Sequence, residues 1–152
     1  MSAPGPGQVL FAFVRHWSRR SPDGGAGTAE RGRLVLVTEA VHSLAERGAT
    51  ATVNAVAHEI GIDQSGASRL IKCAAEEGYL VMAPSRADGR RREASLTAAG
   101  RSLLTQAHRW QEQVFAQLTA DWSAERRRYF QRAMTELIDR SHTLETPHGH
   151  GA

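Results

Sequence analysis

The apolar residues of this chain recur mostly at the spacing of α-helices. In six segments they return every three or four positions, which places them on one face of a helix. The predicted helices cover 7–20, 31–47, 53–60 and 64–77, followed by two long helices within 97–144 that are joined near 119–123. Thr52 and Asp63 are the expected N-caps of the two short central helices, and Gly61 and Gly78 follow their last residues. The pattern predicts a mainly α-helical protein.

Between the fourth and fifth predicted helices the pattern changes to short alternating runs. Residues 79–83 and 93–96 are predicted strands, and Asp88-Gly89 between them is a turn signal. Two short helices followed by a small β-wing predict a winged helix-turn-helix. In that arrangement a helix and the wing contact DNA together.

We expect these elements to form a single domain over residues 1–152. Its parts are the winged helix-turn-helix lobe at 49–96, the scaffold and dimerisation helices at 7–47 and 97–144, a Gly-rich loop at 21–27, and Pro/Gly-rich ends at 1–6 and 146–152. We predict that the two ends are disordered.

The composition narrows the class of protein. Arginine and lysine number 19 against 16 acidic residues, and Lys72 is the only lysine. Arginine binds phosphates and guanine through its fork of donors, although a GC-rich genome would also enrich arginine. A single cysteine, Cys73, excludes an intrachain disulfide and fits a reducing compartment. Without an apolar run of membrane-spanning length or a signal peptide, we expect a cytoplasmic protein with no membrane partner.

The fourth predicted helix has an outward face suited to a DNA groove. With its apolar positions turned inward, the outward residues are Gln64, Ser65, Ser68, Arg69 and Lys72. In the major groove arginine recognises guanine, glutamine recognises adenine, and serine binds either base or phosphate. The helix N-terminus also attracts phosphate. An ordinary solvated face is the alternative interpretation.

The hairpin tip that follows is strongly basic. Its arginines are Arg86, Arg90, Arg91 and Arg92. An arginine at such a tip can enter a narrow minor groove, where the negative potential is enhanced. Asp88 would repel phosphate, so we expect it to shape the turn. A solubilising loop is the alternative, and the polar helix beside the wing makes DNA binding the better hypothesis.

From about Gly7 to His142 the chain resembles the MarR-type winged helix-turn-helix regulators. The residues that carry the resemblance are Val53–Ser65, Ser68–Ile71, Glu77–Leu80, Asp88-Gly89-Arg90 and Leu96–Gly100. The last two segments match the family's D-x-R wing and L-T-x-x-G helix start. The resemblance implies a transcriptional regulator, commonly a repressor, that binds pseudo-palindromic DNA as a homodimer with Arg90 in the minor groove. It also implies release from DNA by a small molecule, often an aromatic one.

The residues also favour association. The first helix and the last two have apolar stripes that one small winged domain cannot cover, and such exposed patches mark interfaces. A two-fold homodimer would place two recognition helices about 34–36 Å apart, one turn of DNA.

Several residues are candidates for sensing. His16, Trp17, His42 and Trp110 are predicted to border a pocket for an aromatic ligand, with core and interface packing as the alternative for the tryptophans. His108 and Glu112 are spaced i,i+4 and suggest a metal-responsive alternative. No dense motif links the seven histidines, so we predict no metal or cofactor. Cys73 would allow redox control, but its place at the edge of the fourth helix's inner face predicts a small packing residue.

Other function classes have less support. The sequence has no Gly-rich phosphate loop, nucleophile motif or dense carboxylate pair, so we do not expect an enzyme. A winged helix used only for protein interaction predicts a neutral wing, whereas this wing is basic. The operator, the regulated genes and the effector cannot be named from the sequence.

Overall fold

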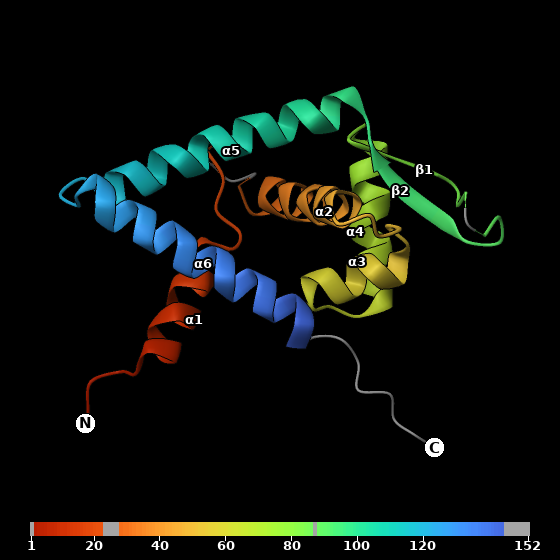
Figure 1. Ribbon diagram of the computed structural model, residues 1–152. Helices are drawn as coiled ribbons and strands as arrows, with labels where there is room; N and C mark the ends of the chain where they lie inside the picture. Colours follow the sequence, from red (N-terminus) through yellow and green to blue (C-terminus); the bar gives the residue numbers. More distant parts are fainter. Residues whose placement is uncertain (1, 23–27, 87, 145–152) are drawn as a thin grey trace, which may run out of the picture. The chain divides into compact units, whose positions relative to one another are not determined.

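A computed structural model describes residues 2–22, 28–86 and 88–144. Within these residues the elements are α1 (Pro6–Trp17), α2 (Thr28–Glu46), α3 (Val53–Ile60), α4 (Gln64–Glu76), β1 (Leu80–Pro84), β2 (Arg92–Leu96), α5 (Ala98–Leu118) and α6 (Ala124–Leu144) (Figure 1). This order confirms the predicted mainly α-helical fold with a small β-wing. The chain forms two compact units, 1–111 and 112–152.

Helix α1 begins earlier and ends earlier than predicted. Pro6 occupies its first turn, where the fixed φ of proline suits a helix, so this residue is helical and the prediction of disorder is wrong for it. The helix ends at Trp17 instead of Arg20, and the Arg20 guanidinium donates a hydrogen bond to the carbonyl of His16. The predicted loop at 21–27 lies largely outside the described residues, as does the predicted disordered end at 146–152.

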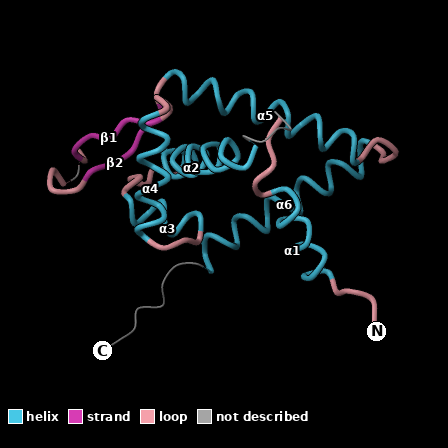
Figure 2. The backbone as a smooth tube through the Cα atoms, turned by 180° about the vertical axis from the view of Figure 1, so that it is seen from behind, coloured by secondary structure: helices cyan, strands magenta, loops and turns pink. Residues whose placement is uncertain are grey.

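The core of the first unit lies among α2, α3, α4 and the base of the hairpin. Val37 and Val41 of α2 and Val56 of α3 are almost completely buried, and Ala67 of α4 joins them. The small side chains on α4 let the three helices pack closely (Figure 2). The Thr38 hydroxyl is also buried, and it donates to the carbonyl of Leu34 at 2.7 Å. The core therefore fixes the helix-turn-helix against α2.

The turn between α3 and α4 has the capping chemistry that the sequence predicts. The Thr52 hydroxyl accepts a hydrogen bond from the Ala55 N–H at 3.1 Å and starts α3. Gly61 ends it with a φ of +79°, a backbone region that favours glycine. The N–H groups of Gly61 and Ile62 both donate to the carbonyl of Ala57, at 2.9 and 3.0 Å. Only three residues thus separate α3 from α4.

The wing is an antiparallel pair in which Leu80 lies opposite Leu96 and Pro84 lies opposite Arg92. Strand β1 is shifted by one residue at both ends relative to the predicted 79–83, and β2 begins one residue before the predicted 93–96. The Ala94 N–H donates to the carbonyl of Ala51 at 2.8 Å and anchors β2 beside α3. The turn end of the hairpin points away from α2, α3 and α4 (Figures 1 and 2).

A close contact joins the wing to α5. The Thr97 hydroxyl donates to the carbonyl of Gly78 at 2.5 Å and accepts from the Gly100 N–H at 3.0 Å. A Cβ at Gly100 would lie closer than 3.0 Å to the carbonyl oxygen of Tyr79. The L-T-x-x-G start of α5 therefore brings its backbone directly against the base of the hairpin.

The second unit contains the end of α5 and all of α6, joined through 119–123 as predicted. The rings of Phe115 and Phe130 stack at 5.7 Å, and Trp122 meets Phe130 edge-on at 5.6 Å. The Arg127 guanidinium donates to the carbonyl of Thr119 at 2.7 Å, which caps the end of α5. None of the helices in the described parts of the chain is long and apolar enough to cross a membrane.

Candidate nucleic-acid interface

The start of α4 is built around Asp63. Its carboxylate accepts hydrogen bonds from the Ser65 hydroxyl at 2.5 Å and from the Gly66 N–H at 3.3 Å. The bond from Ser65 is the main reason why the pKa of the Asp63 carboxyl lies below its ordinary value. Because the Ser65 hydroxyl donates its hydrogen bond to Asp63, its oxygen can only accept a hydrogen bond from DNA. The carboxylate also offsets part of the positive potential at this end of the helix.

The predicted DNA-facing residues of α4 all lie on its exposed face. These residues are Gln64, Ser65, Ser68, Arg69 and Lys72. Ala67, Ile71 and Ala74 are buried on the opposite side, and Leu70 is half-buried. Small residues near the helix start leave room for close approach to a groove, with Arg69 as the longest side chain near that end.

The wing tip is shaped by Asp88, as expected. Its carboxylate accepts from the backbone N–H of Arg90 at 3.1 Å and lies 3.9 Å from the guanidinium of Arg91. The turn is closed by the Ser85 N–H, which donates to the carbonyl of Arg91 at 2.7 Å. The side chains of Arg86, Arg90 and Arg91 are exposed. Asp88 thus bonds the backbone N–H of Arg90, while the Arg90 side chain is exposed near the tip.

Arg92 has a different place from the other wing arginines. It belongs to β2, and its guanidinium donates to the carbonyl of Met82 at 3.3 Å. Together with Ser68 and Lys72 of α4 it lines a hollow of about 480 Å³ between the recognition helix and the wing. Two positive charges and a hydroxyl above an apolar floor suit a DNA phosphate and its sugar.

The prediction that Cys73 is a small packing residue at the edge of the apolar face of α4 is wrong, because the residue is exposed. It follows Lys72 on the outer side of α4, whereas Ile71 and Ala74 on either side of this pair are buried. One helical residue turns a side chain by about 100°, which is enough to move a position at the edge of the apolar face into solvent.

The four candidate pocket residues form two separate groups, and each group contacts an aromatic side chain of α5. Trp17 meets Trp110 edge-on at 5.9 Å, and the ring of His16 lies 5.0 Å from that of Trp17. His42 of α2 lies 6.5 Å from His108, two residues before Trp110 in α5. The structure thus brings the two tryptophans together and adds His108 to the candidate set.

His108 is paired with Glu39, a residue that the sequence analysis did not select. Its Nε2 lies 2.8 and 3.0 Å from the two carboxylate oxygens of Glu39 on α2. The sequence had suggested Glu112 as its neighbour because of the i,i+4 spacing. Within the described residues no three His, Cys, Asp or Glu side chains are grouped so that they could hold a metal ion.

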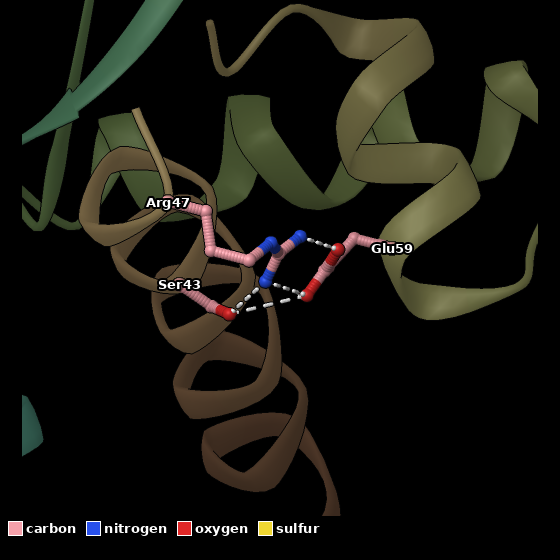
Figure 3. Close-up of polar contacts among 3 residues, drawn as sticks. All are labelled: Ser43, Arg47 and Glu59. Atoms are coloured by element: carbon pink, nitrogen blue, oxygen red, sulfur yellow. Dashed lines mark hydrogen bonds and ion pairs between the residues drawn. The ribbon is translucent and has the colours of Figure 1, made fainter. Parts of the chain in front are cut away.

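A second cross-helix ion pair was also missed. Arg47, just past α2, binds Glu59 near the end of α3, and Ser43 contacts both (Figure 3). The sequence signals this contact only by placing the residues near the ends of consecutive helices. That signal is weak, because the contact also depends on the angle at which α2 crosses α3, which the sequence does not give.

Large apolar side chains lie exposed on helices at both ends of the described chain. Helix α1 buries none of its residues, and its exposed set is Val9, Phe11, Phe13 and Val14. Helix α6 also buries none, and its exposed set is Tyr129, Phe130, Leu137, Ile138 and Leu144. Exposure of this extent is typical of an association surface.

No protein-family model matches the sequence, and no curated protein matches it. Solved structures do match. A MarR family transcriptional regulator from Silicibacter pomeroyi DSS has a TM-score of 0.66 at 19% identity, over 90% of this chain and 89% of that one. BpsR of Bordetella bronchiseptica has a TM-score of 0.61 at 19% identity, over 91% and 96%. The PcaV transcriptional regulator of Streptomyces coelicolor has a TM-score of 0.57 at 15% identity, over 93% and 99%.

These similarities extend over nearly the whole length of each protein, and they agree with the motifs at the wing and at the start of α5. The chain has the winged helix-turn-helix fold of the MarR-type transcriptional regulators.

Proposed function

We propose that this protein is a transcriptional regulator that binds pseudo-palindromic operator DNA as a homodimer and acts as a repressor. The observation that carries the proposal is that one lobe holds two elements suited to DNA. The exposed polar face of α4 and the arginine-rich wing belong to the same lobe, and Arg92 joins them at one hollow. A helix and a wing with this chemistry fit the major groove and the adjacent minor groove.

The chemistry of the candidate residues supports separate roles. Arg69 suits guanine, and Gln64, the first residue of α4, suits adenine. Ser68, Lys72 and Arg92 are suited to phosphate and sugar, and Arg90 to the minor groove. Arg86 and Arg91 add positive charge that attracts DNA without selecting its sequence.

The exposed apolar residues of α1 and α6 support the homodimer. Phe11 is 65% exposed and Leu137 is 45% exposed, which is costly for large apolar side chains in a monomer. A two-fold dimer would cover such surfaces and present two copies of α4 to DNA.

A small aromatic acid is the effector class that we propose. The Trp17–Trp110 pair offers aromatic faces, while His16 and His42 offer groups that bind a carboxylate when protonated. Two similar structures support control by a small molecule: PcaV is in complex with its natural ligand, and the DNA binding of BpsR is regulated by 6-hydroxynicotinic acid, an aromatic acid. The ligand would act by favouring a dimer conformation that does not fit DNA.

Salt-dependent binding to a random-sequence duplex tests the DNA-binding proposal. Affinity should fall steeply as salt rises, because each neutralised phosphate releases counterions. Arg90→Ala should weaken binding to specific and random duplexes alike, by about 1–3 kcal/mol. Absence of binding at low salt would contradict the proposal and favour a protein-interaction module. Unchanged affinity of Arg90→Ala would remove that residue from the interface.

Tryptophan fluorescence tests the effector. An added aromatic acid such as 6-hydroxynicotinate should quench the emission and shift the DNA titration to higher protein concentration. Zinc, with and without a chelator, tests the metal-responsive alternative in the same titration. If neither addition shifts the titration, neither sensing proposal stands.

A further inference from the structure

A two-point polar contact between the end of α2 and α3 involves residues outside the proposed interface. Arg47 donates two hydrogen bonds to the carboxylate of Glu59, from Nη1 to Oε1 at 3.1 Å and from Nη2 to Oε2 at 2.5 Å (Figure 3). This two-point geometry fixes direction as well as distance. The Ser43 hydroxyl completes the cluster, lying 2.5 Å from Arg47 Nη1 and donating to Glu59 Oε1 at 3.2 Å.

The position of Glu59 connects this cluster to the recognition helix. Glu59 is the penultimate residue of α3, and Gly61, Ile62 and Asp63 are the only residues between the two helices. The backbone bonds of Gly61 and Ile62 to Ala57 hold that turn to the end of α3. A shift of the α3 end relative to α2 is therefore passed to the start of α4.

The other end of the contact is Arg47, the first residue after α2, the helix that carries His42 among the candidate sensing residues. Helix α2 holds Glu39, paired with His108 of α5, and His42 one turn nearer to Arg47. Arg47 lies eight positions after Glu39, which is about 12 Å along a helix at 1.5 Å per residue. Helix α2, with Arg47 directly after it, thus contacts α5 at one point and α3 at another.

We propose that Arg47 and Glu59 are positioning residues that hold the start of α4 in its DNA-binding orientation relative to α2. The proposal rests on the proposed DNA-binding function. The side chain of Arg47 is 32% exposed and that of Glu59 is 16% exposed. Solvent reaches both side chains and screens the pair in part. The apolar contacts of Val56 and Ala57 already attach α3 to the core, so the ion pair restrains orientation more than it adds stability.

Two conservative variants and their combination test the role. Arg47→Lys keeps the charge but loses the fork, and Glu59→Gln keeps the shape but loses the charge. Each should lower the ratio of operator affinity to random-duplex affinity by about three- to tenfold, with little change in Tm. The double variant should lose no more than either single variant, because both remove the same contact. The operator is the duplex that the wild-type protein enriches most from a random-sequence library.

Arg140→Gln is the matched control. Arg140 forms an exposed ion pair with Glu136 one turn away on α6, so its loss removes an arginine–glutamate contact that joins no second helix. This variant should leave the affinity ratio within twofold of wild type.

Hydrogen exchange provides a readout that needs no DNA. In Arg47→Lys and Glu59→Gln the amides of 61–66 should exchange faster than in wild type, while those of the α2 core should not. Unchanged exchange and an unchanged affinity ratio in both variants would overturn the proposal. Equal losses on operator and random DNA would also overturn it, since they indicate a general electrostatic effect. Failure of the wild-type protein to bind any duplex would instead refute the proposed function.

Discussion

Gly100→Ala offers a sharp test of how α5 is joined to the wing. In most helices a Gly-to-Ala change stabilises the protein, by about 0.4–1 kcal/mol, because alanine restricts the unfolded chain. At Gly100 the added Cβ would lie closer than 3.0 Å to the carbonyl oxygen of Tyr79 and 3.5 Å from the side chain of Leu96. The closer neighbour is backbone, which cannot rotate away.

The net effect follows from two opposing magnitudes. Overpacking against fixed atoms lowers stability by about 1–3 kcal/mol. This loss exceeds the gain of about 0.4–1 kcal/mol that alanine brings by restricting the unfolded chain. The start of α5 would have to move, and the bonds of Thr97 to Gly78 and Gly100 would lengthen. For a chain of this size we expect Tm to fall by about 2–6 °C.

Gly7→Ala is the control. Gly7 lies in the first turn of α1, and a Cβ there would meet no atom within 4 Å. That variant should melt at the wild-type temperature or slightly above it. Thermal denaturation followed by circular dichroism measures both variants in one buffer. If Gly100→Ala melts at or above the wild-type temperature, the close approach of α5 to the hairpin is not as described.

Substitutions at three further positions test other parts of the molecule. Arg69→Ala should cost more affinity on the operator than on a random duplex, whereas equal losses would make Arg69 a phosphate contact only. Asp63→Ala should lower Tm, while Asp63→Asn, which still caps the helix, should lower it less. Because the folded-state pKa of Asp63 is lowered, its stabilising effect is complete above about pH 4 and is lost as pH falls through the folded-state value. The Tm gap between wild type and Asp63→Ala should therefore narrow in acid, and a constant gap would argue against the ionised cap. Leu137→Asp should give a monomer or an unfolded chain, since burying an unpaired charge at an interface is costly, and sedimentation that shows a folded, intact dimer would exclude Leu137 from the interface.

Local signals predicted the helix-turn-helix and the wing well. The caps at Thr52 and Asp63 and the glycines at 61 and 78 mark the ends of α3 and α4 because these residue types satisfy helix ends over a few residues. Asp88 shaped the wing turn as expected, through a bond to the backbone two residues away. Each of these features depends on neighbours in the sequence.

Contacts between distant segments could not be predicted in the same way. The Glu39–His108 pair spans 69 positions, and the Arg47–Glu59 pair depends on how α2 crosses α3. Cys73 was misplaced because a periodic pattern locates the centre of an apolar face better than its edge. Such features depend on packing angles that no local pattern contains.

A footprint on the preferred DNA tests the central proposal most directly. Fragments of the source genome that the purified protein enriches would be cleaved by hydroxyl radicals with and without the protein. We predict two symmetric protected segments whose centres lie about 34–36 Å apart, one helical turn, as two copies of α4 in a dimer require. The Arg90→Ala protein should protect the same segments only at higher concentration. Enrichment of no fragment, or uniform protection along the duplex, would contradict the assignment of this protein as a sequence-specific DNA-binding regulator.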